Sequence, residues 1–583
     1  MGLTNREIAD MFETVADMLQ IKGENIHRIL SYRRASETIR EVPRDLHAIA
    51  DEGKLTDIQN VGKTIAEKIT EMLETSELEF YNRLAKEVPP GVVAVLRING
   101  VGPKKAKLFW KELNITNIEL LKQAAEKQEL RALSGMGAKS EQKIIDGIES
   151  LARQTGRTRL GDALPIAQSI LDHLMALPDA IEGEIAGSIR RGRPTIGDVD
   201  ILIASDNAQP IMDTFVNMES VSRILGHGPT KSSVELHSGL QVDLRILEKA
   251  RWGTALNYFT GSQAHNVRIR QLALDKGLSL NEHALRPVDA DGNISQDESQ
   301  HILCATEKAI YEAVRLPYIA PELREDNGEI EAGFADKLPN LITMNDIIAD
   351  LHMHTTWSDG KLSVYEMAEA AKKRGREYIV ITDHSRSLGI ANGLSIERLL
   401  EQQKEVRQVN EEMGGSFHVF HGTEMDINAD GSLDYPDDIL EQLDFVIASL
   451  HVSLRQDRKQ ITQRLLNAIE NPHVDLIGHP RAQLIPSREP VDADMDAVLE
   501  AAVKYKTALE INANPHRLDL EAQYARRAVE MGIVLSINTD AHKEEQMDLM
   551  SYGVITARRG WVEAKNVLNT WSVDQFIEWT KNR

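Results

Sequence analysis

The part of the chain that most restricts its fold is the region from Asp346 onward, which alternates apolar strands with helical segments about seven times. Repeated strand–helix units predict a parallel sheet, because parallel strands need long crossover connections, which helices provide. The expected strands are Ile347–Leu351, Tyr378–Thr382, Phe417–His421, Phe445–Leu450, Val474–Gly478, Leu509–Asn512 and Ile533–Asn538. The pattern therefore predicts a parallel α/β domain in this region.

Metal-binding residue types lie at or just after the ends of these strands. A lone histidine would more often be structural, but nine such residues at strand ends indicate a metal centre. A closed barrel of about seven strands would bring the first and last of them together, whereas an open sheet would keep them apart. Mixed imidazole and carboxylate ligands suit Zn²⁺ or Mn²⁺ better than Mg²⁺. The residues are His352, His354, Asp359, His384, Glu424, His451, His479, Asp540 and His542.

A second informative stretch begins at Gly187, where an expected half-buried strand over residues 180–186 ends. Ser188 can open a short helix at this point. Backbone N–H groups at a helix start, with Arg190 and Arg191 beside them, are suited to binding phosphate. The stretch is thus expected to bind a phosphorylated ligand.

Three carboxylates follow this stretch. Asp198 and Asp200 begin an expected strand, and residues two apart on a strand share a face. An isolated Asp-Val-Asp is more typical of a solvated strand end, but here it follows a phosphate-binding pattern. Asp243, in the apolar run of residues 240–246, supplies a third carboxylate on a neighbouring strand. Such a set can hold two Mg²⁺ ions for phosphoryl transfer.

The N-terminal region is expected to be helical and to bind DNA. Residues 57–66, 98–106 and 133–139 each read as helix, glycine turn and helix, the helix-hairpin-helix pattern that binds a DNA phosphate through backbone amides. One Gly-x-Gly would usually be a plain turn, but three copies, two of them followed closely by lysines, favour phosphate binding. The expected DNA-binding residues are Val61, Gly62, Gly100, Val101, Gly102, Lys104, Lys105, Gly135 and Gly137.

The distribution of charge along the chain supports a DNA-binding N-terminal part that is distinct from the acidic C-terminal domain. The net charge of −23 argues against nucleic acid as a partner. Residues 100–159, however, carry 12 Lys+Arg against 7 Asp+Glu, whereas residues 346–583 carry 26 against 39. The single cysteine, Cys304, excludes an intrachain disulfide, and the lack of a signal peptide or long apolar span predicts a soluble, cytoplasmic protein.

The motif Gly-Ser-x-Arg-Arg-Gly at Gly187, with Gly-Asp-x-Asp at Gly197, resembles the nucleotidyltransferases of DNA polymerase family X. Residues 258–262 are similar to that family's nucleotide-binding turn, and residues 280–287 to the end of its fingers. The resemblance implies that Asp198, Asp200 and Asp243 are catalytic and hold two Mg²⁺ ions. It also implies that the nucleotide contacts Gly187, Ser188, Arg191, Gly197, Tyr258, Phe259, Gly261, Asn266 and Arg270.

Two of these assignments, the sugar-sensing aromatics and a lysine, carry open alternatives, and one position departs from the family's pattern. By resemblance, Tyr258 and Phe259 sense the 2′ position of the sugar, although they could be ordinary core aromatics. Lys68 matches the family's lysine that removes a 5′-deoxyribose phosphate by Schiff-base chemistry, and a surface lysine is an equally good interpretation. Gln241 stands where well-known animal repair members have an arginine near the primer phosphate, which would weaken the hold on the primer.

The C-terminal motifs His-Met-His, Thr-Asp-His, Gly-His-Pro and Thr-Asp-Ala-His resemble the polymerase and histidinol phosphatase (PHP) domain, a trinuclear phosphoesterase. The resemblance implies that Glu424 bridges two ions. His352, His354 and Asp540 would then hold one ion, and His451 and His479 the other. Asp359, His384 and His542 would hold a third.

These expectations give a multidomain chain. An all-α helix-hairpin-helix region precedes an α+β nucleotidyltransferase palm with fingers, and a distorted (β/α)7 barrel follows. The expected boundaries are 1–90 for a DNA-binding domain, 91–158 for a thumb-like helix-hairpin-helix domain, 159–250 for the palm, 251–316 for the fingers, 317–345 for a linker and 346–583 for the PHP domain.

The expected function is gap-filling DNA synthesis in base excision repair, with a metal-dependent 3′→5′ exonuclease and an open question of cleavage at abasic sites. Expected partners are gapped or primer–template DNA and deoxynucleoside triphosphates, bound by a monomer near the nucleoid. Three alternatives stay open: a template-independent nucleotidyltransferase, a small-molecule phosphatase tethered to a DNA-binding region, and a non-catalytic DNA scaffold.

Overall fold

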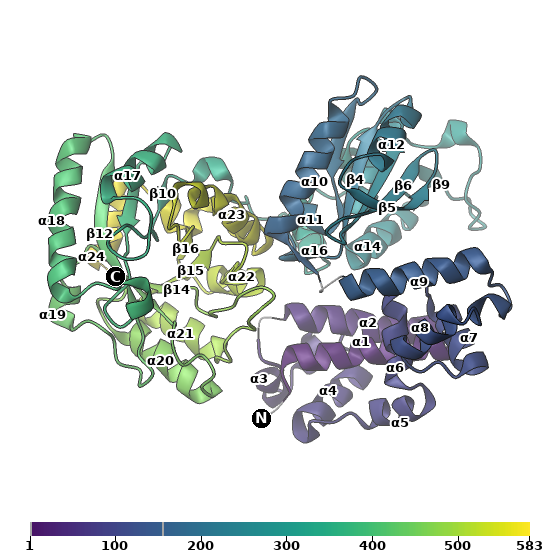
Figure 1. Ribbon diagram of the computed structural model, residues 1–583, viewed down its shortest axis with the longest axis horizontal. Coiled ribbons are helices and arrows are strands. Elements are labelled where there is room, and N and C mark those ends of the chain that lie inside the picture. The colour runs from purple at the N-terminus through teal and green to yellow at the C-terminus, as the bar shows by residue number, and fades with distance from the viewer. Residues whose placement is uncertain (1–2, 43, 99, 154–156, 583) are drawn as a thin grey trace. The chain divides into compact units, whose positions relative to one another are not determined.

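The computed structural model describes residues 3–42, 44–98, 100–153 and 157–582 (Figure 1). They form two compact units, the first comprising residues 1–157 with Leu236–Leu240 and the second residues 158–235 with 241–583. Asn99, part of the second expected glycine turn, lies outside the described residues. Within the described ranges, no helix combines the length and the apolar character needed to cross a bilayer.

The first unit is helical, as predicted. Ile8, Phe12 and Val15 recur at helical spacing on one face of its first helix and are fully buried in the shared core. Its helices are α1 (Asn5–Lys22), α2 (Ile26–Glu41), α3 (Leu46–Asp51), α4 (Lys63–Thr75), α5 (Glu79–Glu87), α6 (Pro90–Ala94), α7 (Pro103–Leu113), α8 (Ile118–Glu126) and α9 (Ala138–Arg153), with short 3₁₀ turns at Leu55–Asp57, Val95–Arg97 and Leu130–Ala132.

The three glycine turns share one geometry. Each follows a 3₁₀ turn and has a residue of positive φ at the same position: Asn60 (63°), Gly100 (89°) and Gly135 (75°). Glycine is favoured there because only it adopts this conformation without strain, and asparagine tolerates it best among the others. A glycine two residues later (Gly62, Gly102 or Gly137) directly precedes α4, α7 or α9. The expected threefold repeat of the hairpin is therefore confirmed.

The second unit begins with a palm. In the described residues its main sheet has five strands in the order β2-β4-β7-β6-β5, with β4 and β7 parallel. The strands are β2 (Glu182–Ile185), β4 (Asp198–Ala204), β5 (Val221–His227), β6 (Lys231–Leu236) and β7 (Gln241–Leu247). Helices α10 (Leu160–Met175) and α12 (Ala208–Val216) pack against the sheet. The short β1 (Thr158–Arg159) and β3 (Thr195–Ile196) pair with each other, and α11 (Gly187–Arg190) follows β2.

The region after the palm forms one core with the segment expected to be a linker. It contains α13 (Trp252–Thr260), α14 (Gln263–Leu274), β8 (Leu278–Leu280), β9 (Leu285–Pro287) and α15 (Glu307–Ala313). The linker prediction for residues 317–345 is wrong: the segment includes α16 (Glu329–Phe334), and Ile319, Leu323 and Ile330 are buried in this core. A buried ion pair between Arg324 and Glu307 also holds the segment in place. Charged residues add nothing to an apolar periodicity, so the sequence pattern did not reveal this packing.

The C-terminal region is a parallel barrel, which confirms the predicted fold class. Among the described residues its strands follow chain order, and a bridge between Met353 and Ala541 joins the first strand's end to the last. The strands are β10 (Ala349–Asp350), β11 (Tyr378–Ile381), β12 (His418–Asp426), β13 (Phe445–Ser449), β14 (Leu476–Gly478), β15 (Ala508–Asn512) and β16 (Leu535–Asn538). The main helices are α17 (Val364–Lys373), α18 (Ile396–Met413), α20 (Arg458–Glu470), α21 (Met495–Tyr505), α22 (Ala522–Glu530), α23 (Met550–Arg559) and α24 (Val573–Asn582).

Candidate active sites and nucleic-acid interface

The three palm carboxylates meet on adjacent parallel strands. The register of β4 and β7 places Asp200 opposite Asp243 and Asp198 opposite Gln241, while Val199 and Ile201 are fully buried on the other face. Burial, followed by the charges of Asp198 and Asp243, raises the pKa of Asp200 to about 7. Three neighbouring carboxylates, one of which has a raised pKa because the others are close, make a site suited to divalent cations.

Two neighbours orient Asp243. Gln241 donates a hydrogen bond to its Oδ1 at 2.9 Å, and the Lys231 Nζ lies 2.9 Å from its Oδ2. Gln241, which the sequence suggested only as a weak point in primer binding, therefore positions a metal-ligand candidate. Gly187 meets the same cluster, because a Cβ there would lie 2.6 Å from an Asp200 oxygen and its φ is +62°. Glycine is required at this turn.

The two arginines of the phosphate-binding stretch are both engaged. Arg190 makes a bidentate ion pair with Glu307, at 2.9 and 3.0 Å, so its guanidinium is structural rather than a phosphate ligand. Arg191 donates to the Thr260 carbonyl at 2.7 Å and to Glu325 at 3.1 Å. From α23 of the barrel, Arg559 donates to the Arg191 carbonyl at 2.6 Å. The phosphate-binding stretch is thus held by Glu307, by Glu325 with the Thr260 carbonyl, and by Arg559.

The nucleotide turn at the end of α13 is built around Asn266. Its Nδ2 donates to the carbonyls of Tyr258 (2.7 Å) and Gly261 (3.1 Å), and Arg270 Nε donates to the Asn266 carbonyl at 3.2 Å. The rings of Tyr258 and Phe259 meet edge to face at 5.0 Å. Asn266 therefore shapes the turn, and Tyr258 is a partly exposed ring rather than a core residue.

All nine metal-ligand candidates of the barrel converge at one mouth. Glu424 is fully buried at the centre, and its Oε2 lies 3.4 Å from His352 Nε2 and 2.9 Å from His384 Nδ1. Its Oε1 lies 3.3 Å from His451 Nε2 and 2.9 Å from His479 Nε2. Among the described residues, three groups have ligand atoms within 4.8 Å: His354, Asp359, His384 and His542; His352, His354 and Glu424; and His384, Glu424 and His451. His354 and His384 each belong to two of these groups, whereas the family resemblance assigned each of them to a single ion.

The state of these side chains fits metal ions. Both oxygens of Glu424, Nε2 of His352 and both ring nitrogens of His354 and His479 are buried, yet make no hydrogen bond to any described residue. Buried polar atoms without partners are costly, so a cluster that brings this many of them together is suited to an occupant that they can bind. The donor set of imidazoles and carboxylates matches Zn²⁺ or Mn²⁺.

Outer partners that the sequence did not reveal orient the histidines. Glu510 Oε1 lies 2.7 Å from His352 Nδ1, and Asp426 Oδ1 lies 2.6 Å from His451 Nδ1. Such carboxylates fix the ring tautomer and turn the other nitrogen toward the metal. Glu510 is the one charged residue of strand β15, in which only Asn512 is also polar, and Asp426 shares a strand face with Glu424. Both patterns could have indicated them.

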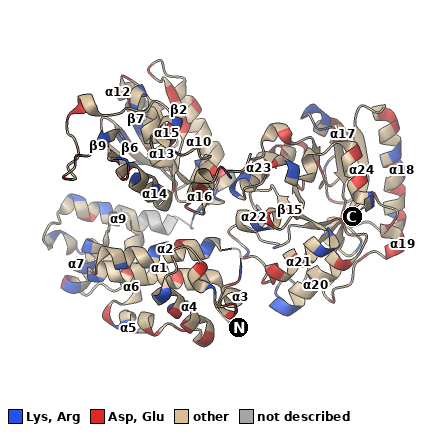
Figure 2. Cartoon of the chain, turned by 180° about the vertical axis from the view of Figure 1, so that it is seen from behind, with Lys and Arg blue, Asp and Glu red and all other residues tan. Residues whose placement is uncertain are grey.

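The hairpins of the first unit offer backbone rather than side chains. Val61 and Val101 are buried, so only their main chain can meet DNA. An added Cβ at Gly62, Gly102, Gly135 or Gly137 would meet nothing within 4 Å, which leaves room for a phosphate. Lys104 is exposed at the start of α7, whereas Lys105 Nζ donates to the Gly100 carbonyl at 2.8 Å. Figure 2 shows the basic residues along α7.

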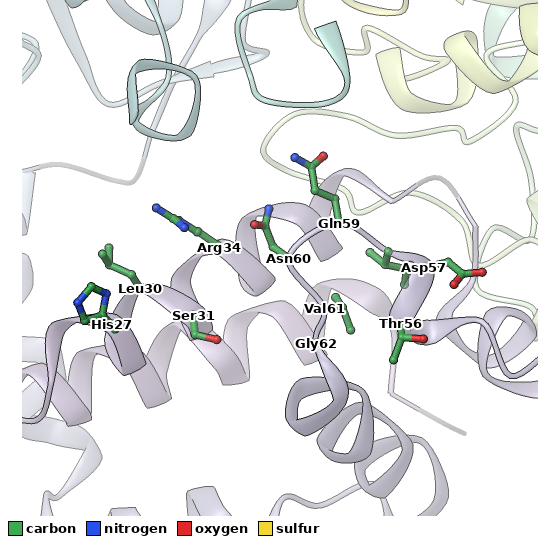
Figure 3. A pocket seen from close by; sticks show the side chains of 11 residues that line it. His27, Leu30, Ser31, Arg34, Thr56, Asp57, Gln59, Asn60, Val61 and Gly62 are labelled. Carbon is green, nitrogen blue, oxygen red and sulfur yellow. The ribbon is translucent and has the colours of Figure 1, made fainter. Parts of the chain in front are cut away.

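A pocket of about 510 Å³ adjoins the first hairpin (Figure 3). One wall is formed by His27, Ser31 and Arg34 of α2, and the other by the turn at Asn60 and Gly62. The pocket thus combines exposed turn backbone with an arginine and a histidine.

Lys68 on α4 is half-buried in a cationic cluster. Its Nζ lies 4.6 Å from the centre of the Phe80 ring. The guanidinium carbons of Arg28 and Arg83 lie 5.1 and 5.3 Å from the same ring centre. Tyr32 stacks on the same ring. Burial lowers the pKa of Lys68. The charges of Arg28 and Arg83 lower it further, whereas those of Glu67 and Glu71 raise it. An amine in such a place is a better nucleophile than a solvated one.

Four family models match the chain. They are a helix-hairpin-helix domain over residues 3–78, a SAM-like helix-hairpin-helix tandem over 92–150, the DNA polymerase beta thumb over 255–325 and the PHP domain over 350–514. The thumb model covers the region that the sequence analysis termed the fingers, together with part of the expected linker.

The similarity to whole proteins agrees with these family models. The chain is 40% identical over 578 residues to the "DNA polymerase/3′-5′ exonuclease PolX" of Bacillus subtilis (strain 168), a match that covers 98% of this chain and 99% of that one. It is 26% identical to DNA polymerase lambda of Rattus norvegicus over 55% of this chain and 56% of that protein. A probable phosphatase of Thermoanaerobacter sp. (strain X514) is 30% identical over 41% of this chain and 96% of its own length.

Proposed function

This chain belongs to the family of DNA polymerase/3′-5′ exonucleases represented by PolX of Bacillus subtilis, and we propose on that basis that it fills short gaps in damaged DNA and trims 3′ ends. The observation that carries the proposal is the presence of two separate centres, a three-carboxylate palm and a histidine-rich barrel mouth. The first suits nucleotidyl transfer and the second suits phosphodiester hydrolysis.

In synthesis, the palm would bind a deoxynucleoside triphosphate beside the primer end. Ser188 and Arg191 would hold the β- and γ-phosphates, and Tyr258 with Phe259 would lie against the sugar. The primer 3′-hydroxyl attacks the α-phosphate, and pyrophosphate leaves. Asp198, Asp200 and Asp243 would hold two Mg²⁺ ions, which neutralise the charge that develops on the phosphate oxygens.

In hydrolysis, the barrel mouth would receive the 3′-terminal phosphodiester. The nine clustered residues would hold up to three Mn²⁺ or Zn²⁺ ions, which supply Lewis-acid chemistry and activate water. Glu510 and Asp426 keep His352 and His451 in the ligating orientation. We further propose that the chain acts as a monomer on the DNA of the cytoplasm.

The test is to incubate the purified full chain with a labelled one-nucleotide gap, with and without deoxynucleoside triphosphates, in Mg²⁺ and in Mn²⁺. We expect template-directed extension by one nucleotide when the triphosphates are present, and 3′ shortening when they are absent. Extension that ignores the template would favour a template-independent transferase. Activity on a small phosphate monoester, with none on DNA, would favour the phosphatase alternative.

The hairpins predict a specific salt dependence. Replacing the exposed Lys104 with alanine should weaken DNA binding for all sequences and lower the slope of log affinity against log salt by about 0.9, the value for one lost phosphate contact. Fluorescence anisotropy with a gapped duplex at several salt concentrations measures it. Lys86→Ala, which removes an exposed lysine from α5, should leave the slope unchanged; an equal drop in both variants would contradict a specific role for α7.

Lys68 supports a second proposed activity, removal of a 5′-deoxyribose phosphate. The Lys68 amine would add to the sugar C1′ and expel water as a Schiff base. Loss of a C2′ proton would then break the C3′–O bond and leave a 5′-phosphate on the DNA. The depressed pKa and the adjacent Arg28 and Arg83, which suit a phosphate, support this role.

Borohydride reduction should trap the wild-type chain on DNA with a 5′-deoxyribose phosphate, and Lys68→Arg should lose at least nine-tenths of the trapped product. The arginine variant keeps the positive charge, so DNA binding measured in parallel should stay within about twofold. Undiminished trapping by the arginine variant would assign the chemistry to another amine.

A further inference from the structure

A guanidinium that none of the assignments above uses lies at the rim of the barrel's metal centre. Arg517 follows β15 in a tight turn, in which its backbone N–H donates to the Asn514 carbonyl at 2.7 Å and its carbonyl accepts from Gln483 at 2.8 Å. The side chain is 16% exposed, and its Nε lies 3.8 Å from Oδ2 of Asp540. The residue is therefore held in place beside a metal-ligand candidate.

One nitrogen at the end of this side chain lacks a hydrogen-bond partner among the described residues. Nη1 of Arg517 is buried and makes no hydrogen bond to any described residue. Oδ2 of Asp540 is already taken by Asn512, which donates to it at 3.1 Å, and the Arg517 separation of 3.8 Å exceeds a hydrogen bond. A buried charged donor left unpaired is costly, so its position indicates a ligand that the protein itself does not supply.

The surroundings specify the sign of that ligand. One oxygen of Asp540, Oδ2, lies 3.8 Å from Arg517 Nε, and the other, Oδ1, lies 3.1 Å from His354 Nε2, so the guanidinium lies next to the metal-ligand cluster. Arg488 is near enough for Arg517 to lower its pKa in addition to burial. Arginines close together repel each other, and the buried Asp519 near them offsets this only in part, because burial raises the pKa of its carboxyl to about 8.

We propose that Arg517 binds the substrate phosphate at the hydrolytic centre, with Nη1 donating to a non-bridging oxygen of the terminal phosphodiester. This inference rests on the proposed hydrolytic function and assigns the part of the site that recognises substrate. Arginine suits the role because its planar fork matches phosphate oxygens and its charge persists at any working pH. The contact also strengthens as negative charge accumulates on those oxygens during hydrolysis.

The test measures phosphate binding directly. Inorganic phosphate is titrated into the metal-loaded full chain by calorimetry, and elemental analysis gives the metal content of each variant. Arg517→Ala should bind phosphate about 10- to 100-fold more weakly with unchanged metal content, the range for one lost charge-assisted hydrogen bond. Arg517→Lys should be intermediate. Arg407→Ala, which removes the same charge from the exposed face of α18, should bind as wild type does.

Two results would overturn the assignment. Wild-type phosphate affinity in a folded, metal-loaded Arg517→Ala chain would show that the guanidinium does not meet phosphate. Loss of metal from that variant would show that Arg517 only supports Asp540. If the alanine variant does not fold, the lysine variant decides, since unchanged affinity there contradicts a role for the guanidinium fork. A wild-type chain that binds phosphate but leaves 3′ ends intact would instead contradict the proposed function.

Discussion

Asp200→Ala is expected to reduce nucleotide addition by several orders of magnitude while 3′ hydrolysis continues at the wild-type rate. Asp200 lies between Asp198 and Asp243 on the paired strands β4 and β7, where its carboxylate is the central ligand candidate. Without it the two remaining carboxylates cannot hold both cations in line with the attacking and leaving oxygens. None of the three belongs to the barrel cluster, so hydrolysis does not depend on them.

Primer extension and 3′ shortening are measured on the same gapped duplex. Asp206→Ala is the matched control, because Asp206 is an exposed aspartate shortly after β4 and outside the carboxylate cluster. It should retain both activities. Equal loss of extension and shortening in a folded Asp200→Ala chain would mean that a single centre performs both reactions.

Glu424→Gln should produce the opposite separation, with hydrolysis reduced by several orders of magnitude and synthesis retained. The Glu424 oxygens face His352 and His384 on one side and His451 and His479 on the other, at 2.9 to 3.4 Å, and both lack hydrogen-bond partners in the described part of the chain. Glutamine has the same size but carries no charge and offers one oxygen, so it cannot bridge two cations.

Elemental analysis should show fewer bound ions in Glu424→Gln than in the wild type, alongside the loss of 3′ shortening. Glu401→Gln, an exposed change on α18, should keep the full metal content and both activities. Full metal content in the Glu424 variant would show that the cluster does not use this residue as a bridge.

Features that depend on residues close together in the chain could be predicted from the sequence. The three hairpins follow from glycines at fixed offsets, because a positive φ at Asn60, Gly100 and Gly135 is a local requirement of the turn. The shared face of Asp198 and Asp200 follows from the period of two along a strand. The barrel follows from repeated strand–helix units, and the convergence of its histidines from the rule that parallel strands end at one mouth.

Only the tertiary structure decided which charged groups neutralise one another. Residues 317–345 lack an apolar period and suggested a linker, yet Arg324 pairs with Glu307 and the segment packs into a core. Arg190, expected beside a phosphate, is bound by Glu307, 117 residues away. Ion pairs form between segments brought together by the fold, and their strength depends on burial and distance rather than on spacing in the chain. The sequence by itself thus determined the elements and the chemical types at their ends. The assembled structure determined which side chains the protein itself holds and which buried polar atoms, such as the Glu424 oxygens and Nη1 of Arg517, make no hydrogen bond to a described residue.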